Sequence, residues 1–412
     1  MDGNHGGCDG GRRRFLGAAA ATTAGAALAS TNSARADEPQ APAGAANAKP
    51  AVPLVTLGRT GQKVTKLGMG TSWAVQPSFV QTAVFAGVRY IDTSESYENT
   101  VAEQVLGDAL ERSKTRKDVY LVTKNSQYRR ATGERALKVI EERLDGSLAR
   151  LKTDYVDCYY LHGMSGREMS LLKDPAVKSA FEDLKRRGKI KFSGLSCHDA
   201  KLPEILDLAA EVGWVDQIMF KYNFRSVNHD ALQRAVDKAA KLNMGLVAMK
   251  TQGGAEATYP DKVKEFVQKG FKREVAAIKS VFTDERMHVV VSEMTNREQL
   301  RENMSATREA LTAKEARLLE EHRERTANLY CHGCGHLCET SAKGVPVATV
   351  LRYLRYYQAY GKRDQARALY QALPAESRAI VDIDADVLDA ACPHGLPVTE
   401  LLRTADKRLG LA

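Results

Sequence analysis

Short apolar runs alternate with segments of helical periodicity through most of this 412-residue chain. A strand that is followed by a helix and then by another strand pairs in parallel, because a parallel connection needs a crossover. Eight such units predict the α/β class and a (β/α)8 TIM barrel over residues 54–325. The predicted strands are Lys66–Thr71, Tyr90–Thr93, Val119–Lys124, Val156–His162, Phe192–Ser196, Gln217–Asn223, Gly245–Lys250 and Val289–Glu293.

The segments between these runs supply the crossovers. The predicted helices are Val101–Leu110, Gly133–Leu151, Val177–Arg187, Leu202–Val212, Ala231–Leu242, Pro260–Phe282 and Arg297–Asn303. A hairpin over residues 54–64, with glycine in its turn, precedes the first unit and is expected to cap the bottom of the barrel.

Ionisable side chains stand at or just past the carboxyl ends of three successive predicted strands. Asp92 ends one run with Tyr97 five residues later, Lys124 ends the next run, and His162 ends the third. In a parallel barrel these strand ends converge on one mouth, where the chemistry of such barrels takes place. We therefore expect the four side chains to meet.

The four residue types match the needs of carbonyl reduction. Tyr97 can give a proton to the developing alkoxide if a neighbouring charge tunes it, and Lys124 supplies that charge while Asp92 orients the lysine. His162 can hydrogen-bond the substrate carbonyl. Each residue alone has an ordinary explanation, such as a helix cap or a loop aromatic. Their order on consecutive strands favours the functional interpretation.

These residues carry a resemblance: from about residue 54 to residue 305 the sequence is similar to the aldo-keto reductases. Asp92, Tyr97, Lys124 and His162 fall where that family has its catalytic tetrad. The resemblance implies an oxidoreductase that interconverts an aldehyde or ketone and its alcohol, by hydride transfer from a nicotinamide cofactor, NAD(P)(H). The implied partner is a small-molecule carbonyl or alcohol substrate.

The resemblance also implies residues that hold the nicotinamide ring. Ser196 and Gln217 stand at the family's carboxamide-binding positions, although Cys197 replaces the usual asparagine. Met249 stands where an aromatic residue usually stacks on the ring. Ordinary strand residues remain the alternative explanation for all of these positions.

At the adenine end the sequence departs further from the family pattern. Glu302 and Asn303 match a family pair, and counting back from them places Glu293 and Gln299 where a lysine and an arginine usually grip the 2′-phosphate of NADPH. A carboxylate repels that phosphate but can accept a hydrogen bond from a ribose hydroxyl. We therefore expect NAD to be favoured over NADP, although Arg297 or Arg301 could compensate.

After about residue 325 the character of the chain changes, and residues 326–412 read as a helical appendage. Its cysteines are Cys331, Cys334, Cys338 and Cys392. They resemble the ferredoxin-type extension of one aldo-keto reductase branch, which normally contains two cysteine runs. The surviving cysteines amount to one complete ligand set, which implies a single [4Fe–4S] cluster. Two disulfides, or a zinc site assisted by His332, His336 or His394, remain alternatives.

The N-terminus resembles a twin-arginine export signal. Paired arginines precede a weakly apolar run and a small-x-small site within residues 1–36. Residues 37–53, rich in alanine and proline, read as a disordered linker. The resemblance implies a periplasmic or exported protein that engages the twin-arginine translocase after folding around its cofactors.

Composition limits the classes of partner. The net charge is +9, but basic residues stand beside acidic ones, which favours a solvated surface over a nucleic-acid site. No apolar run is long enough for a stable membrane span. A redox partner is possible if a cluster is present. A second functional hypothesis stays open: a non-catalytic or electron-transfer barrel protein with a degenerate nicotinamide site.

Overall fold

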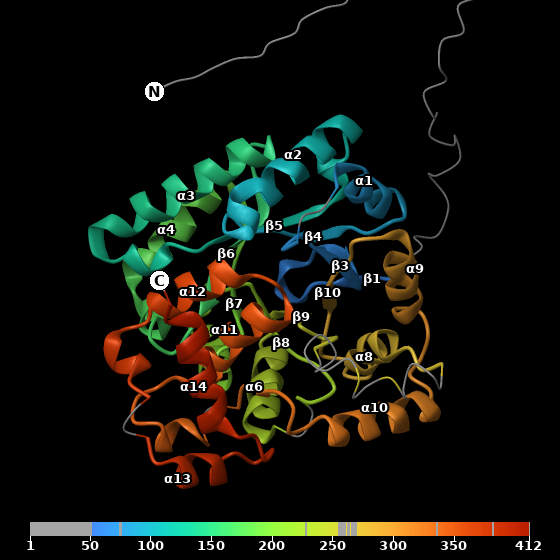
Figure 1. Ribbon diagram of the computed structural model, residues 1–412. Coiled ribbons are helices and arrows are strands. Elements are labelled where there is room, and N and C mark those ends of the chain that lie inside the picture. Colours follow the sequence, from blue (N-terminus) through green and yellow to red (C-terminus); the bar gives the residue numbers. More distant parts are fainter. Residues whose placement is uncertain are drawn as a thin grey trace, which may run out of the picture. The chain divides into compact units, whose positions relative to one another are not determined.

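The barrel predicted from the sequence is the centre of the structure, a computed structural model. It describes residues 52–73, 76–226, 229–253, 261, 264, 270–334, 337–380 and 383–411. Eight parallel strands close in the order β10-β3-β4-β5-β6-β7-β8-β9 (Figure 1). They are β3 (Leu67–Gly70), β4 (Tyr90–Asp92), β5 (Tyr120–Asn125), β6 (Val156–Met164), β7 (Ile190–Cys197), β8 (Gln217–Lys221), β9 (Gly245–Met249) and β10 (Val289–Glu293).

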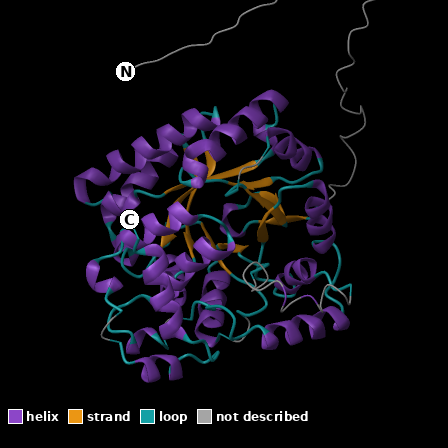
Figure 2. Cartoon of the chain, in the orientation of Figure 1, coloured by secondary structure: helices purple, strands orange, loops and turns teal. Residues whose placement is uncertain are grey.

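Helices surround these strands, as Figure 2 shows. Their apolar faces pack against the outward-facing strand residues in the largest hydrophobic cluster. The barrel helices are α1 (Pro77–Phe85), α2 (Val101–Ser113), α3 (Ala136–Leu151), α4 (Pro175–Arg186), α5 (Leu202–Glu211), α6 (Asp230–Lys241), α8 (Arg273–Val281), α9 (Arg297–Ala306) and α10 (Ala313–Arg325).

The helices show where the sequence prediction was incomplete. Helices α1 and α10 were not among the predicted segments. The helix predicted over residues 260–282 lies partly outside the described residues, and its described part, α8, begins at Arg273. Helix α3 begins at Ala136 because a 3-10 turn occupies Gly133–Arg135.

The hairpin caps the amino ends of the strands, as expected. Strands β1 (Leu54–Thr56) and β2 (Lys63–Thr65) pair antiparallel. Between them, Gly58 has a φ of +47°, and a Cβ there would lie 2.6 Å from the backbone nitrogen of Gly245, at the start of β9. Only glycine allows this close approach, which seats the hairpin against the bottom of the barrel.

Below its mouth the barrel interior is filled with side chains. The rings of Tyr90 and Tyr120 stack at a centroid distance of 5.4 Å, and the hydroxyls of Tyr90 and Tyr160 lie 3.1 Å apart. Gly194 makes room for Tyr160, because a Cβ at that position would lie 2.4 Å from the Tyr160 ring. Below its mouth the barrel is therefore a packed core.

The C-terminal helices have a hydrophobic cluster of their own, which includes Leu351, Tyr370 and Leu402. They are α11 (Val347–Ala359), α12 (Arg363–Gln371), α13 (Ala385–Ala390) and α14 (Val398–Leu409). The first two of these helices are separated at Gly361, whose φ is +64°. The barrel and these helices belong to one compact unit.

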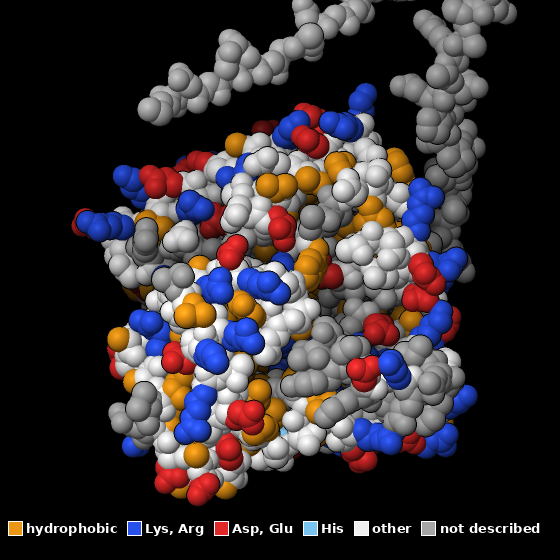
Figure 3. Space-filling view, in the orientation of Figure 1, with side chains coloured by type: hydrophobic (Ala, Val, Ile, Leu, Met, Phe, Trp, Pro, Cys, Tyr) orange, Lys and Arg blue, Asp and Glu red, His pale blue; other side chains and the backbone are white. Residues whose placement is uncertain are grey.

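The surface fits the expectation from charge patterning. On the face drawn in Figure 3, basic and acidic side chains are interspersed over the helices. Within the described part of the chain, no helix combines the length and the apolar character that crossing a membrane requires.

Candidate active site

Three of the four predicted catalytic residues form one hydrogen-bonded group. Lys124 Nζ, near the end of β5, donates to Asp92 Oδ2 at 2.7 Å and to Tyr97 Oη at 3.0 Å. The carbonyl oxygen of Thr93 accepts a further hydrogen bond from the same ammonium at 2.7 Å. Asp92 and Lys124 are buried, whereas Tyr97 is partly exposed at the mouth. The lysine therefore links a buried carboxylate to a phenol that a ligand can reach.

His162 completes the predicted set. Its ring lies edge-on to the Tyr97 ring, with 5.5 Å between centroids. Nδ1 lies 2.9 Å from the hydroxyl of Ser94, 3.0 Å from that of Ser126 and 3.3 Å from that of Ser96. Hydroxyls that donate to Nδ1 leave the ring proton on Nε2, where it can reach a carbonyl oxygen. Sequence reasoning missed these serines.

Burial and charge shift the proton affinities in this group. Burial raises the pKa of Asp92 to about 6, although Lys124 opposes the shift. The pKa of Tyr97 is raised well above its usual value by burial and by the charges of Asp92 and Glu293. Burial and the neighbouring Lys124 hold the pKa of His162 well below its usual value. At neutral pH Tyr97 is therefore a phenol and His162 a neutral imidazole.

The predicted nicotinamide residues lie on adjacent strands. Ser196 Oγ accepts the backbone N–H of Gly163 at 2.9 Å. Gln217 lies deeper by two residues along the paired strands β7 and β8, and its Oε1 accepts the Tyr120 hydroxyl at 3.2 Å. The Gln217 Nε2 is buried and has no hydrogen-bond partner among the described residues. Met249 ends β9 and packs on the interior cluster.

The adenine-end residues make contacts within the chain. Asn303 is buried, and its Nδ2 donates to Ser292 Oγ at 3.0 Å. Glu302 is paired with Lys272. Glu293 turns its carboxylate to the loop after β3, where Oε1 accepts the backbone N–H of Ser72 at 2.9 Å. This group is therefore separate from the residues at the mouth, apart from Glu293, whose charge acts on Asp92 and Tyr97.

The C-terminal helices contact several loops of the mouth. Lys362 Nζ donates to the Ser72 carbonyl at 2.8 Å, and Arg352 Nη1 to the His198 carbonyl at 3.4 Å. Lys250 Nζ, directly after β9, donates to Tyr356 Oη at 3.0 Å. These loops follow β3, β7 and β9, so the helices extend over the carboxyl ends of the barrel strands.

Tyr356 is the functional candidate that sequence reasoning missed. It lies on α11, and its charge contributes to the raised pKa of Tyr97. The sequence showed it only as one tyrosine in a helical segment rich in aromatics. Such a pattern is typical of a packed helix face, and it contained no signal that could have found this residue.

Three of the four tail cysteines belong to one hydrophobic cluster: Cys338 lies within it, and Cys331 and Cys392 pack against it. The pKa of Cys334 is raised to about 11 by burial and by the charges of Cys331 and Cys392, and the same neighbours contribute to the raised pKa of Cys338. The backbone N–H of Gly333 donates to Cys331 Sγ at 3.3 Å. Among the described residues, no three His, Cys, Asp or Glu side chains are placed to hold a single metal ion.

The alternative ligands in the tail are only partly described. His332 and His394 stack with 3.7 Å between their ring centroids, which is an arrangement of two rings rather than of two donors around one ion. His336 lies outside the described residues. Residues 1–36, which carry the predicted export signal, lie outside them as well.

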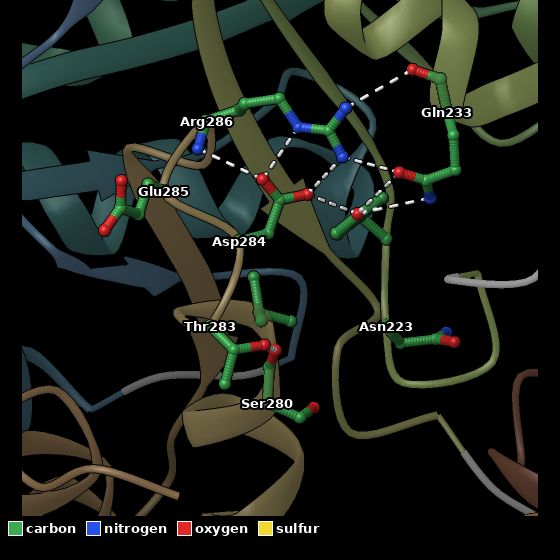
Figure 4. Close-up of a pocket in the computed structure, with 9 residues that line it drawn as sticks. Asn223, Gln233, Ser280, Thr283, Asp284, Glu285 and Arg286 are labelled. Carbon is green, nitrogen blue, oxygen red and sulfur yellow. Dashed lines mark hydrogen bonds and ion pairs between the residues drawn. The ribbon is translucent and has the colours of Figure 1, made fainter.

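A surface hollow of about 450 Å³ lies elsewhere and contains none of the predicted residues. Figure 4 shows the side chains of Arg286, Asp284 and Gln233 turned towards one another. Arg286 Nη2 lies 2.7 Å from Asp284 Oδ2, and Arg286 Nη1 donates to Asp237 Oδ1 at 2.5 Å. Because these charges already neutralise one another, the hollow offers little to a ligand.

Comparisons with known proteins agree with this geometry. The sequence model of the aldo/keto reductase family matches residues 69–324, which excludes the cysteine-bearing tail. The uncharacterized oxidoreductase YqkF of Bacillus subtilis is 25% identical over 281 residues, which cover 62% of this chain and 90% of YqkF. The methylglyoxal reductase YeaE of Escherichia coli is 32% identical over 181 residues, which cover 43% of this chain and 60% of YeaE.

Solved structures show the same fold. An aldo-keto reductase from Klebsiella pneumoniae in complex with NADPH has a TM-score of 0.51 and 23% identity, over 66% of this chain and 94% of that one. The holo form of AKR11C1 from Bacillus halodurans has a TM-score of 0.54 and 22% identity, over 69% of this chain and 99% of that one. With the family match over more than half of its residues, the chain belongs to the aldo/keto reductase family and is an oxidoreductase.

Proposed function

We propose that this oxidoreductase reduces the carbonyl group of an aldehyde or ketone, or oxidises the corresponding alcohol, with Tyr97 as the general acid or base. One observation carries the proposal: a single ammonium, Lys124 Nζ, donates to both Asp92 and Tyr97. The arrangement couples the phenol to a charged lysine that a carboxylate holds in place. Family membership favours this activity over a non-catalytic barrel.

The residues divide the work between orientation and proton transfer. His162 Nε2 hydrogen-bonds the substrate carbonyl, because a serine hydroxyl that donates to Nδ1 keeps the ring proton on Nε2. Tyr97 gives its proton to the oxygen of the carbonyl as negative charge develops there. Lys124 stabilises the phenolate that remains. In the oxidation of an alcohol the proton moves in the opposite direction.

As an aldo/keto reductase the chain depends on NAD(P), and the bound nicotinamide supplies the hydride. Ser196, Gln217 and Met249 would hold the ring, and the unpaired Nε2 of Gln217 fits the oxygen of its carboxamide. Preference for NAD over NADP is part of the proposal, since Glu293 and Gln299 occupy the two positions that would grip a 2′-phosphate. A kcat/KM that is higher with NADPH than with NADH would overturn this preference.

The direct test of the proposed reaction is Tyr97→Phe. We expect kcat to fall about 10²- to 10⁴-fold, the range of a lost general acid. Methylglyoxal is a suitable first substrate, because the relative YeaE is named for it. The matched control is Tyr155→Phe, which removes a phenol directly before β6, at the opposite end of the barrel. Full turnover by Tyr97→Phe contradicts the assignment.

A single [4Fe–4S] cluster bound by Cys331, Cys334, Cys338 and Cys392 is the second part of the proposal. The mutual proximity of the four thiols supports it, as does the backbone N–H that donates to Cys331 Sγ. Protein purified without oxygen should show a broad visible absorption band and four irons per chain in the [4Fe–4S] stoichiometry. Cys392→Ser should lose both, whereas a colourless wild type with stoichiometric zinc refutes the cluster.

Export by the twin-arginine route and a periplasmic location complete the proposal. The support is the ordered signal pattern in residues 1–36. Fractionation of cells that express the full chain should recover the protein outside the cytoplasm. Replacement of Arg12 and Arg13 by lysine should retain it inside, and unchanged export of that variant contradicts the route.

A further inference from the structure

One side of the barrel mouth collects positive charge. Lys221 ends β8, Lys250 follows β9, and Arg352 lies on α11. Arg352 lies about one helical turn from Tyr356 on α11, and Tyr356 Oη accepts a hydrogen bond from Lys250 Nζ at 3.0 Å, so Arg352 and Lys250 lie near each other. Burial, Arg352, Lys250, His162 and Lys221 together hold the pKa of His198 well below its usual value.

Each of these three cations donates a hydrogen bond to a neutral group. Lys250 Nζ donates to the Tyr356 hydroxyl at 3.0 Å, and Arg352 Nη1 donates to the His198 carbonyl at 3.4 Å. Lys221 donates to the His332 carbonyl. Within the described ranges, none of the three makes an ion pair with a carboxylate.

Two acidic groups lie in the same neighbourhood without neutralising these cations. Asp199 acts on the pKa of Arg352 through space, and Arg352 acts on that of Glu339. Asp199 Oδ1 is used by the backbone N–H groups of Gly166 and Lys201. Lys250 and Arg352 thus lie close together without an ion-paired carboxylate among the described residues, and an anion bound between them would offset the cost of that arrangement.

We propose that Lys250, Arg352 and Tyr356 form a binding site for an oxyanion group of a ligand in the barrel mouth. Two sources share this chemistry: a carboxylate carried by the carbonyl substrate, and the diphosphate of the nicotinamide cofactor. The proposal rests on the proposed reaction at Tyr97 and adds a substrate class to it. It also makes the C-terminal helices part of the ligand site.

The three side chains suit an oxyanion in different ways. Lys250 offers a point charge, Arg352 a planar set of N–H donors, and Tyr356 a hydroxyl. Burial raises the pKa of Tyr356, but the charges of Lys250, Arg352 and Lys362 outweigh it, so that the pKa is lowered overall. Tyr97, in the loop after β4, keeps its own proton because burial and the charges of Asp92, Glu293 and Tyr356 raise its pKa. An acidified phenol is a stronger hydrogen-bond donor to an oxyanion.

The substrate source is tested with matched carbonyl compounds of equal size. We compare kcat/KM for three oxo acids, glyoxylate, pyruvate and succinic semialdehyde, with kcat/KM for the neutral amide of each. We expect kcat/KM to be higher for the acid than for its amide in at least one of these three pairs. Lys250→Met should lower kcat/KM for that acid about 10- to 100-fold, the effect of one lost charge-assisted hydrogen bond, and bring the acid-to-amide ratio towards one. Lys250→Arg should restore part of the ratio.

The control is Lys241→Met, which removes an exposed lysine at the end of α6 and should leave the ratio unchanged. Thermal melting of each variant shows whether it is folded. If no carbonyl compound is reduced by the wild type with either cofactor, the proposed reaction fails, whereas the binding measurement below still reports on the oxyanion site.

Calorimetric titration separates the two sources without turnover. Pyruvate is titrated without cofactor, and NADH without substrate. Weaker pyruvate binding by Lys250→Met identifies the substrate carboxylate, and weaker NADH binding identifies the diphosphate. If both ligands bind Lys250→Met as tightly as wild type, the oxyanion site is overturned.

Discussion

Two lysine–tyrosine pairs lie at the barrel mouth. The distance from lysine Nζ to tyrosine Oη is the same in both pairs, but the pKa of the tyrosine is shifted in opposite directions. Lys124 Nζ lies 3.0 Å from Tyr97 Oη, and Lys250 Nζ lies 3.0 Å from Tyr356 Oη. The pKa of Tyr97 is raised well above its usual value, whereas that of Tyr356 is lowered. A lysine beside a tyrosine is therefore not sufficient to define the role of that tyrosine.

The difference lies in the third partner of each pair. Asp92 Oδ2 accepts from Lys124 at 2.7 Å, so the positive charge of that lysine is largely neutralised and the nearby carboxylate opposes ionisation of Tyr97. Lys250 has no such carboxylate among the described residues, and Arg352 adds a second positive charge near Tyr356. We infer that the first pair keeps a proton for the reaction, whereas the second offers positive charge to a ligand.

Replacement of Lys124 and of Lys250 in turn should distinguish the roles of the two pairs most clearly. Lys124→Met should lower the rate of the chemical step about 10²- to 10⁴-fold, because the phenolate of Tyr97 loses its stabilising charge. Lys250→Met should act mainly on ligand affinity. Single-turnover kinetics with saturating substrate distinguish the chemical step from binding. Equal losses in the chemical step for both variants would contradict the division of roles.

Low pH should reduce kcat through protonation of Asp92, the partner of Lys124 in the first pair. Its pKa is raised to about 6 by burial, so the carboxylate is present above this pH and is lost as the pH falls through it. Protonated Asp92 no longer forms an ion pair with Lys124. If this single carboxylate is required, kcat should fall about tenfold for each pH unit below about 6. His162 stays neutral over this range because its pKa is depressed.

Asp92→Asn provides the control for this pH dependence, since an amide does not titrate. The kcat of this variant should be low, because Lys124 has lost its charged partner. It should also be nearly independent of pH between about 5 and 8. A pH–rate profile of Asp92→Asn with the wild-type acid limb would show that another group is responsible.

The smallest effect concerns the contact that holds the C-terminal helices near the first pair. Lys362 Nζ donates to the Ser72 carbonyl at 2.8 Å and lies 3.5 Å from Glu98 Oε1, one residue after Tyr97. Lys362→Met should lower the free energy of unfolding by about 0–1 kcal/mol, as for exposed ion pairs. A change in KM with little change in melting temperature is expected. Lys407→Met, an exposed position on α14, is the matched control.

The sequence predicted that Lys124 and Tyr97 would meet, whereas it contained almost no sign of the contact between Lys250 and Tyr356. Asp92, Lys124 and His162 were recognisable because each polar side chain closes an apolar strand and strand ends in a parallel barrel meet. Tyr356 lies in an amphipathic helix, where an aromatic residue is ordinarily part of the core. Its contact with Lys250 joins residues 106 positions apart, and no local pattern encodes such a meeting.

Long-range contacts also limited the prediction of the adenine end. Glu293 was identified by position, but its hydrogen bond to Ser72 spans 221 residues and depends on how β10 and β3 close the barrel. Helix α1 was missed because it has only 9 residues and is mostly apolar, so its pattern resembles that of a strand. The eight strands were predictable because each combines an apolar run with a following crossover.

The position of α11 in the chain sets an order on biosynthesis. All eight barrel strands precede it, and the last strand, β10, ends at Glu293, whereas α11 ends at Ala359. A ribosome therefore releases a chain that can close its barrel before Tyr356, on α11, has been made. We infer that the mouth is uncovered on the side of Lys250 during that interval, until the C-terminal helices form over it.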